Sequence, residues 1–269
     1  MALKDVAARL KLAAHIGYLF TELPLVDRFS AARDAGFEAV DLSDIVRFPL
    51  ADILTGMRRS GLPLLQTTAA VGDRARHGPG LAALPGHEAE FRASCEAALP
   101  HIEATGLRFV HVMAGVPAPD MPFDRCYATY VGNLRWAMQL YAPHRIVVLI
   151  EPINLADIPG YFLGNLALAR RAIAEIGHPD LRLLFDVYHL AMSGLDPVAA
   201  LRDSVRDTGH VQLADCPGRH EPGSGAIDFA ALLAAAAGTG YEGWFSAEYL
   251  PAGETVAGLG WMAAPTFRA

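Results

Sequence analysis

Short runs of apolar residues alternate with amphipathic stretches along almost the whole chain. Runs rich in Val, Ile, Leu and Phe are typical of buried strands, and they occur at 13–18, 38–42, 62–67, 108–113, 146–150, 181–185, 209–211 and 243–247. Stretches with helical periodicity separate them, at 24–35, 51–60, 88–105, 123–141, 165–176, 197–206 and 229–239, and the C-terminal tail can supply an eighth. Such regular alternation predicts a parallel sheet covered by helices.

The strand predicted at 146–150 ends at a carboxylate, Glu151, and the following Pro152 cannot donate a ladder hydrogen bond. For one such residue a salt bridge is the simpler explanation, because an unpaired buried charge is costly. The pattern recurs, however. Each of the next three predicted strands also leads to a side chain that carries oxygen, namely Asp186, Gln212 and Glu248.

The spacing of these four positions is close to that of a barrel. They follow one another by 35, 26 and 36 residues, and a (β/α)₈ barrel of about 250 residues has roughly 31 residues per unit. The C-terminal ends of its strands meet at one mouth, where the active site lies. We therefore predict a (β/α)₈ TIM barrel over residues 1–269, as a single domain because no linker or low-complexity tract divides the chain.

Composition narrows the range of partners. The 269 residues are 52% hydrophobic and 19% charged, which is typical of a globular protein. A net charge of −7 without any basic run argues against a nucleic-acid partner. The apolar stretches are shorter than the roughly 20 residues of a membrane-spanning helix, and the first ten residues lack a signal-peptide core. Three scattered cysteines indicate neither a disulfide framework nor a zinc site, so we expect a cytoplasmic protein.

Glu151, Asp186, Gln212 and Glu248 would meet at the mouth of the predicted barrel. All four offer oxygen atoms, which suit a hard divalent ion such as Mg²⁺ or Mn²⁺ better than Zn²⁺. Three carboxylates in one place repel one another, and a bound cation would relieve that repulsion. The sequence therefore predicts a divalent-metal site made by these four side chains.

Three histidines lie near the predicted site. His189 comes three residues after Asp186, where it can face a substrate or lie on the surface. His111 lies inside a predicted strand and is expected to be a hydrogen-bonded core histidine. His15, in the first predicted strand, can point into the barrel or pack in the core.

Two loops are candidates for substrate contact. The segment 69–86 is long, polar and rich in Gly and Arg, and we predict a lid or substrate loop because loops of more than about 12–15 residues are commonly functional. The segment 215–223 contains Arg219, whose planar guanidinium suits a carboxylate or a phosphate. A salt bridge from Arg219 to Glu221 or Asp215 is the alternative.

Several motifs resemble the hydroxypyruvate isomerase family, which belongs with the xylose isomerase-like barrels. The resemblance covers nearly the whole chain and is densest after Glu151, and its most specific part is the run Pro217-Gly-Arg-His-Glu-Pro222. The other matching motifs are Phe20-Thr-Glu-Leu-Pro24, Val112-Met-Ala-Gly115, Glu151-Pro-Ile-Asn154, Pro159-Gly-Tyr-Phe162, Asp186-Val-Tyr-His189, His210-Val-Gln-Leu-Ala214, Gly240-Tyr-Glu-Gly-Trp244, Glu248-Tyr-Leu-Pro251 and Gly258-Leu-Gly-Trp261.

The resemblance implies a role for each of these polar residues. Glu151 and Glu248 would be the paired catalytic acid and base, and both would touch a divalent metal ion whose ligands Asp186 and Gln212 complete. The substrate would contact His189, Arg219, His220 and Glu221. The implied reaction is an aldose–ketose isomerisation of a small hydroxy-oxo acid through an enediolate, with hydroxypyruvate and tartronate semialdehyde as the nominal pair.

Departures from the family pattern lie mainly in the first half of the chain. Residues 41–46 replace an acidic-aromatic stretch, 66–68 read Gln-Thr-Thr instead of Asn-Thr-Pro, and Leu190-Ala191 replaces a polar pair. Because these positions would line the substrate wall, a 2-oxo-tetronate isomerase, or a ketose 3-epimerase or isomerase on a larger sugar, stays open. More remote alternatives are an endonuclease IV-like phosphodiesterase and a barrel without catalysis. The apolar tail around Trp261 allows either a homo-oligomer or packing on its own barrel.

Overall fold

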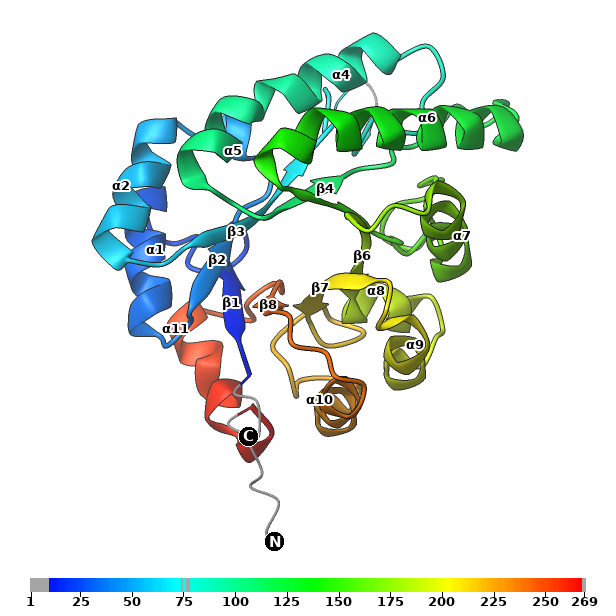
Figure 1. Cartoon of the computed structure of the whole chain (residues 1–269). Helices are drawn as coiled ribbons and strands as arrows, with labels where there is room; N and C mark the ends of the chain where they lie inside the picture. The colour runs from blue at the N-terminus through cyan, green and yellow to red at the C-terminus, as the bar shows by residue number, and fades with distance from the viewer. Residues whose placement is uncertain (1–9, 74, 76–77, 268–269) are drawn as a thin grey trace, which may run out of the picture.

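Eight parallel strands close into a barrel with helices around it (Figure 1). The computed structural model describes residues 10–73, 75 and 78–267. The strands are hydrogen-bonded in chain order, and β8 pairs with β1 to close the sheet. Their bounds are β1 (Leu12–His15), β2 (Ala39–Asp41), β3 (Leu64–Ala69), β4 (Phe109–Val112), β5 (Val147–Ile150), β6 (Leu181–Asp186), β7 (Thr208–Leu213) and β8 (Phe245–Ala247). The predicted (β/α)₈ barrel is confirmed.

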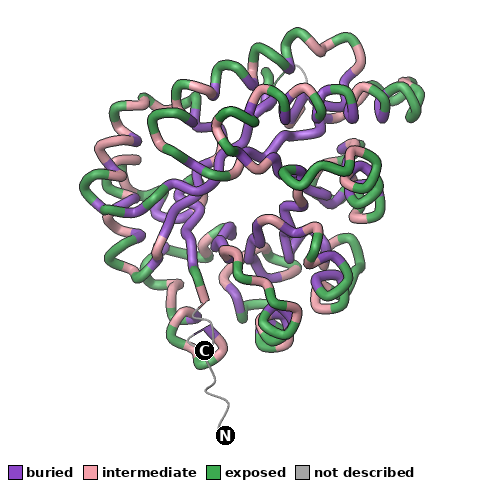
Figure 2. The backbone as a smooth tube through the Cα atoms, in the orientation of Figure 1, coloured by how far each residue is buried: buried purple, intermediate pink, exposed green. Residues whose placement is uncertain are grey.

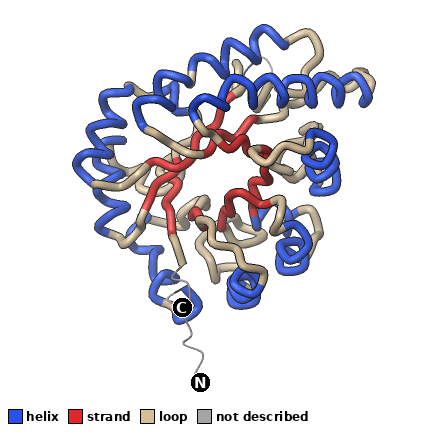
Figure 3. Tube along the Cα trace, in the orientation of Figure 1, coloured by secondary structure: helices blue, strands red, loops and turns tan. Residues whose placement is uncertain are grey.

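The helices form an outer ring around the strands, as Figure 3 shows. They are α1 (Leu25–Asp34), α2 (Leu50–Ser60), α4 (Glu88–Ala97), α5 (Leu99–Thr105), α6 (Phe123–Tyr141), α7 (Leu166–Ile176), α8 (Val187–Met192), α9 (Pro197–Ser204), α10 (Phe229–Gly238) and α11 (Thr255–Gly258). Short 3₁₀ turns are η1 (Ile45–Arg47), η2 (Ala142–His144), η3 (Leu259–Ala263) and η4 (Pro265–Phe267). The strands are buried, whereas the outer surfaces of the helices are exposed (Figure 2).

Two helix predictions are corrected. The single helix predicted at 88–105 is divided into α4 and α5, because Pro100 lies in the first turn of α5 and has no N–H for a continuous ladder. The eighth helix is reduced to the four residues of α11 and the 3₁₀ turns that follow. Trp261 in this tail is only 8% exposed and packs against Tyr249 and Phe267. The tail therefore packs on its own barrel, and a homo-oligomer stays a prediction.

The interior of the barrel changes character along its axis. Ala13, Ala39 and Leu65 form a small apolar cluster with Phe109 and Trp244, near the N-terminal ends of the strands. A polar pair is also fully buried in the barrel: Nε2 of His210 in β7 lies 2.7 Å from Oδ2 of Asp41 in β2. The ring of His210 lies against that of Phe109. The barrel interior is thus filled by apolar side chains near the N-terminal ends of the strands and becomes polar toward their C-terminal ends.

Strand register brings the predicted ligands to one level. Asp186 and Gln212 are direct partners across β6 and β7, and Gln212 is the partner of Ser246 in β8. Because side chains alternate along a strand, Glu248 points to the same side as Ser246, two residues further on. Glu151 directly follows β5. Closure of the sheet therefore directs all four side chains to one mouth.

The segment 69–86 is partly built into the barrel wall. Residues 81–84 are buried, and the amides of Ala82 and Ala83 donate to the carbonyls of Met113 and Ala114 at the end of β4. The side chain of Asn133 in α6 donates to the carbonyl of Ala82. These contacts correct the prediction of a lid for this part of the segment, while residues 74, 76 and 77 lie outside the described residues.

The contact between α1 and α2 leaves no room for a side chain at Gly56, where a Cβ would lie 2.3 Å from the ring of Phe29. We expect Gly56→Ala to lower the free energy of unfolding by about 1–3 kcal/mol, because the buried ring must move. Gly132 in α6 is the matched control, since it is exposed and a Cβ there would meet nothing within 4 Å. Gly132→Ala should raise the free energy of unfolding by about 0.5–1 kcal/mol. Urea unfolding measures both, and equal effects would contradict this packing.

Candidate active site

Four side chains from four successive strands meet in the mouth of the barrel. Glu151, Asp186, Gln212 and Glu248 are each at most 7% exposed. The amide nitrogen of Gln212 donates a short hydrogen bond to Oε2 of Glu248. Arg219 joins Glu248 to Asp186, because its Nη2 lies 3.0 Å from Oε1 of Glu248 and 3.6 Å from Oδ2 of Asp186. The structure therefore brings together side chains up to 97 residues apart in the chain.

Part of this cluster has the composition of a cation site. Ligand atoms of Glu151, Asp186 and His189 all lie within 4.8 Å of one another. Among the described residues, Oε1 of Glu151, Oδ2 of Asp186 and Oε1 of Gln212 are buried without a hydrogen-bond partner. Buried acceptors of this kind are costly unless something binds them, and oxygen ligands suit Mg²⁺ or Mn²⁺. The residues present therefore fit a divalent ion, although the closest group contains His189 as well as the predicted carboxylates.

The two glutamates are hard to ionise. Burial raises the pKa of Glu151 well above its ordinary value, and repulsion from Asp186 and Glu248 adds to the effect. Burial also raises the pKa of Glu248, to about 8, although the neighbouring Arg219 opposes the shift. Carboxylic acids with raised pKa values can hold and release protons near neutral pH.

A buried histidine lies behind each glutamate. Nε2 of His15 is 3.6 Å from Oε2 of Glu248, and Nδ1 of His111 is 3.5 Å from Oε2 of Glu151. Burial lowers the pKa of His15 to about 4 and that of His111 to about 3, so both rings are neutral. His15 points into the barrel, where its Nε2 is also 2.8 Å from Oγ of Ser43. His111 is not the hydrogen-bonded core residue that we expect, because its Nε2 has no partner among the described residues.

Asp186 also starts a short helix, α8, that the periodicity did not predict. Its Oδ1 accepts from the backbone amides of Tyr188 and His189, which is the geometry of a helix N-cap. One carboxylate oxygen is thereby used by the helix, and the other faces the site. The cap also places His189, with Nε2 3.6 Å from Oε1 of Glu151 and 3.8 Å from Oδ2 of Asp186. The Asp-x-x-His sequence carries this cap signal, although six residues are too few for helical periodicity.

The loop after β7 is tied together by Asp215. Its carboxylate accepts from the backbone amides of Cys216, Gly223, Gly225 and Ile227. This compact loop holds Arg219 at a φ of 54°, and the guanidinium lies over the rings of Tyr18 and Tyr188, 5.3 and 5.2 Å from their centres. Arg219 therefore points into the site, and the alternative salt bridge to Asp215 or Glu221 is wrong.

His220 and Glu221 have partners on the segment that follows β8. Nδ1 of His220 is 2.7 Å from the carbonyl oxygen of Leu250, and Oε1 of Glu221 accepts from the amide of Ala252. These contacts attach the loop of Arg219 to the end of β8. Their predicted contact with substrate stays a prediction.

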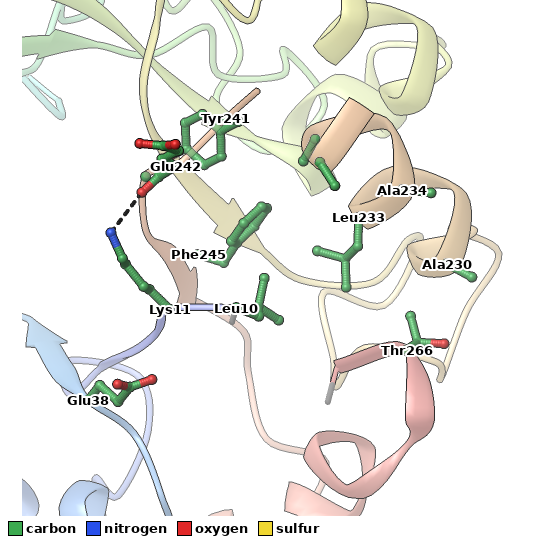
Figure 4. A pocket seen from close by; sticks show the side chains of 13 residues that line it. Leu10, Lys11, Glu38, Ala230, Leu233, Ala234, Tyr241, Glu242, Phe245 and Thr266 are labelled. Carbon is green, nitrogen blue, oxygen red and sulfur yellow. Dashed lines mark hydrogen bonds between the residues drawn. The ribbon is translucent and has the colours of Figure 1, made fainter. Parts of the chain in front are cut away.

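A hollow lies away from these residues, at the N-terminal end of the barrel (Figure 4). It has a volume of about 630 Å³, and its lining of Leu10, Leu233, Phe245 and several alanines is mainly apolar. The ammonium group of Lys11 crosses its edge and donates to the carbonyl oxygen of Glu242. This face of a (β/α)₈ barrel contributes to stability, whereas catalysis takes place at the other end.

A closed barrel of eight parallel strands with polar side chains gathered at their C-terminal ends has the arrangement of the (β/α)₈ enzymes, whose active sites lie at that end. The family model described as xylose isomerase-like TIM barrel matches residues 29–264. The chain belongs to this family.

Three similar proteins illustrate the relationship. A 2-oxo-tetronate isomerase of Cupriavidus necator is 38% identical over 94% of this chain and 97% of its own. The hydroxypyruvate isomerase of Escherichia coli is 31% identical over 94% and 98%. A crystal structure titled AP endonuclease, family 2, from Brucella melitensis is 32% identical, with a TM-score of 0.90 over 94% of this chain and 98% of that one. The curated relatives place the chain among isomerases, as the sequence predicts. Within the described residues, every helix is too short or too polar to cross a membrane.

The raised pKa values of the buried glutamates predict how the free energy of unfolding depends on pH when no metal is present. A carboxylate whose pKa rises from 4.5 to about 8 on folding binds an extra proton in the folded state, so its stabilising effect is lost as the pH rises across that range. His15 and His111, whose pKa values fall on folding, act in the opposite direction but only below about pH 6.5. Between pH 6.5 and 8, the chelator-treated protein should therefore lose on the order of 2 kcal/mol of unfolding free energy.

Urea unfolding at several pH values measures this slope. Added Mn²⁺ should flatten it, because a cation stabilises the ionised carboxylates, and Glu248→Gln should reduce it. A metal-free protein whose stability is constant or increases from pH 6.5 to 8 would contradict the assigned charge states.

Proposed function

We propose that the protein is a divalent-metal-dependent isomerase that moves a carbonyl group between adjacent carbons of a small hydroxy-oxo acid. Hydroxypyruvate and tartronate semialdehyde are the nominal pair. The observation that carries the proposal is the meeting of Glu151 and Glu248, two buried carboxylic acids with raised pKa values, beside Asp186 and Arg219. The similarity to proteins named hydroxypyruvate isomerase and 2-oxo-tetronate isomerase supports the same chemistry.

The reaction requires two proton transfers on carbon. A base takes the proton from the hydroxyl-bearing carbon next to the carbonyl, and the electron pair moves onto the carbonyl oxygen to give an enediolate. A proton is then delivered to the former carbonyl carbon, while the hydroxyl oxygen becomes the new carbonyl oxygen and its proton moves to the other oxygen. Glu151 and Glu248 follow different strands and have different partners, His111 for Glu151 and His15 for Glu248, so they are two separate acid–base groups. One can accept the proton and the other can deliver it.

Arg219 and His189 suit the polar ends of such a substrate. The guanidinium is planar and is held by two aromatic rings, so a substrate carboxylate can meet it with little loss of side-chain entropy. Each of the two glutamates also faces a buried neutral histidine, His15 or His111, which adds no charge beside the acid.

Glu151, Asp186, Gln212 and Glu248 are the residues that would hold the metal ion, and His189 lies beside them. Their buried and unpartnered oxygen atoms are the reason for this assignment. When bound, a divalent ion would supply positive charge where negative charge develops on the substrate oxygens.

A four-carbon 2-oxo-tetronate is the second candidate substrate. The 38% identity to a 2-oxo-tetronate isomerase favours it, and the same carbonyl shift would apply with one more hydroxyl-bearing carbon. Leu190 and Ala191, which we expect in the substrate wall, offer no hydrogen bond to such a hydroxyl. The ratio of kcat/KM for the two acids decides between them. A nuclease is disfavoured by the net charge of −7.

Removal of either carboxylic acid should stop proton exchange. We expect Glu248→Gln and Glu151→Gln to lower the rate at which hydroxypyruvate takes up deuterium from D₂O, in the presence of Mn²⁺, by about 10²–10⁴-fold. Proton NMR of the substrate measures this exchange. Glu96→Gln is the matched control, because Glu96 is exposed on α4, and it should exchange at the normal rate. Near-normal exchange in Glu248→Gln would remove that residue from the chemistry.

Arg219 should discriminate substrates by charge. Arg219→Ala should raise KM for hydroxypyruvate by about tenfold or more, because a charge-assisted hydrogen bond is lost. Dihydroxyacetone is the neutral comparison, since it has a CH₂OH group in place of the carboxylate, and its KM should change much less. Because Arg219 also contacts Glu248, kcat should fall for both compounds. An equal change in the two KM values would remove Arg219 from the carboxylate site.

A further inference from the structure

The side chain of Asn154, in the loop after β5, has only one possible orientation. It is 1% exposed, and its Oδ1 accepts a 2.8 Å hydrogen bond from the backbone amide of Asp157. A backbone N–H can only donate, so the oxygen of the Asn154 amide must lie on that side. Its NH₂ group consequently faces Oδ2 of Asp157 at 3.1 Å and Nδ1 of His189 at 2.7 Å.

This orientation determines which nitrogen of His189 carries the proton. The NH₂ group of an asparagine has donors and no acceptor, so Nδ1 of His189 must accept. In a neutral imidazole the proton is then on Nε2. That nitrogen is on the side of the site, 3.6 Å from Oε1 of Glu151 and 3.8 Å from Oδ2 of Asp186.

We propose that Asn154 is a positioning residue that holds His189 as the Nε2–H tautomer, so that His189 donates a hydrogen bond to a substrate oxygen and is not a metal ligand. A histidine that binds a metal through Nε2 usually donates its Nδ1–H to a carboxylate or a carbonyl. Here the NH₂ group of Asn154 is at hydrogen-bond distance from Nδ1, 2.7 Å, whereas the nearest carboxylate oxygen, Oδ2 of Asp157, is 4.0 Å away. The carboxylate oxygens of Glu151 and Asp186 would then bind the cation, while His189 would donate an uncharged hydrogen bond to the substrate.

The same turn also supports the second substrate-facing group. Oδ1 of Asp157 accepts from the hydroxyl of Tyr188 at 3.2 Å, and the ring of Tyr188 lies against the guanidinium of Arg219. The turn at 154–157 therefore orients the neutral donor His189 directly. It also supports the charged donor Arg219 through the ring of Tyr188. The identity of the substrate oxygen rests on the proposed function, whereas the tautomer rests on the hydrogen bonds alone.

The tautomer can be measured directly by NMR of protein labelled with ¹⁵N-histidine, with His189 assigned by its absence in His189→Gln. We expect the wild-type protein to carry the proton on Nε2, both with chelator and with the diamagnetic ion Mg²⁺. Asn154→Asp keeps the acceptor for the amide of Asp157 but replaces the donor to His189 by an acceptor. The proton should therefore move to Nδ1, and kcat/KM for hydroxypyruvate should fall about tenfold or more.

Asn165→Asp is the matched control. Oδ1 of Asn165 accepts from the amide of Leu168 in the same kind of turn, at the start of α7, and within the described residues Asn165 makes no hydrogen bond to a histidine. This variant should leave both the tautomer of His189 and the activity unchanged.

Three results would overturn the proposal: a wild-type proton on Nδ1, a transfer of the proton to Nδ1 when Mg²⁺ is added, or an unchanged tautomer in Asn154→Asp. The wild-type spectrum is decisive even where the variant fails to fold. An Nε2–H tautomer in a protein without activity on any oxo acid would refute the proposed function and leave the positioning role intact.

Discussion

Mutual repulsion among three buried carboxylates is the constraint on which this site depends. Glu151, Asp186 and Glu248 are together at one end of a closed barrel, where little water can screen their charges. Each has a different degree of compensation. Asp186 has two backbone amides and Arg219, and Glu248 has Arg219 and Gln212. Among the described residues, the side chains within ion-pair distance of Glu151 are the histidines His111 and His189, and Arg219 acts on it less strongly than burial and the two neighbouring acids do. Glu151 therefore has the least compensating positive charge of the three acids, and a bound cation would stabilise it most.

Barrel closure produces the repulsion, and the loops moderate it. A parallel sheet that closes on itself must bring the ends of all its strands to one mouth. The Asp215 loop then places Arg219 against two of the acids, and the turn at 154–157 places His189 against the third. Both loops are fixed by backbone amides that donate to side-chain oxygens, which is a rigid form of support because amide directions follow the backbone. The barrel fold brings the three carboxylates together, and the loops determine that Arg219 and His189 are the donors that face a substrate.

Much of the barrel was predictable because it depends on local pattern. Buried strands are marked by short β-branched runs such as 146–150, and a long helix such as α6 by its periodicity, so their positions agree with the structure within a few residues. Short elements were not predictable in this way. The break at Ala98 depends on one proline, and α8 depends on a single cap. Six residues of a helix contain too few turns to show a period.

By itself, the sequence determined which polar residues follow the buried strands, because the end of a strand is a local property. The regular alternation of strands and helices then predicted a barrel, in which Glu151, Asp186, Gln212 and Glu248 share one mouth. Tertiary structure alone decided how these groups pair. The contacts of His15 with Glu248, of Arg219 with Asp186 and Glu248, and of Asn154 with His189 depend on the tilt of the strands and on side-chain directions across the barrel. Those quantities follow from closure and packing of the whole sheet, and no local pattern of residues contains them.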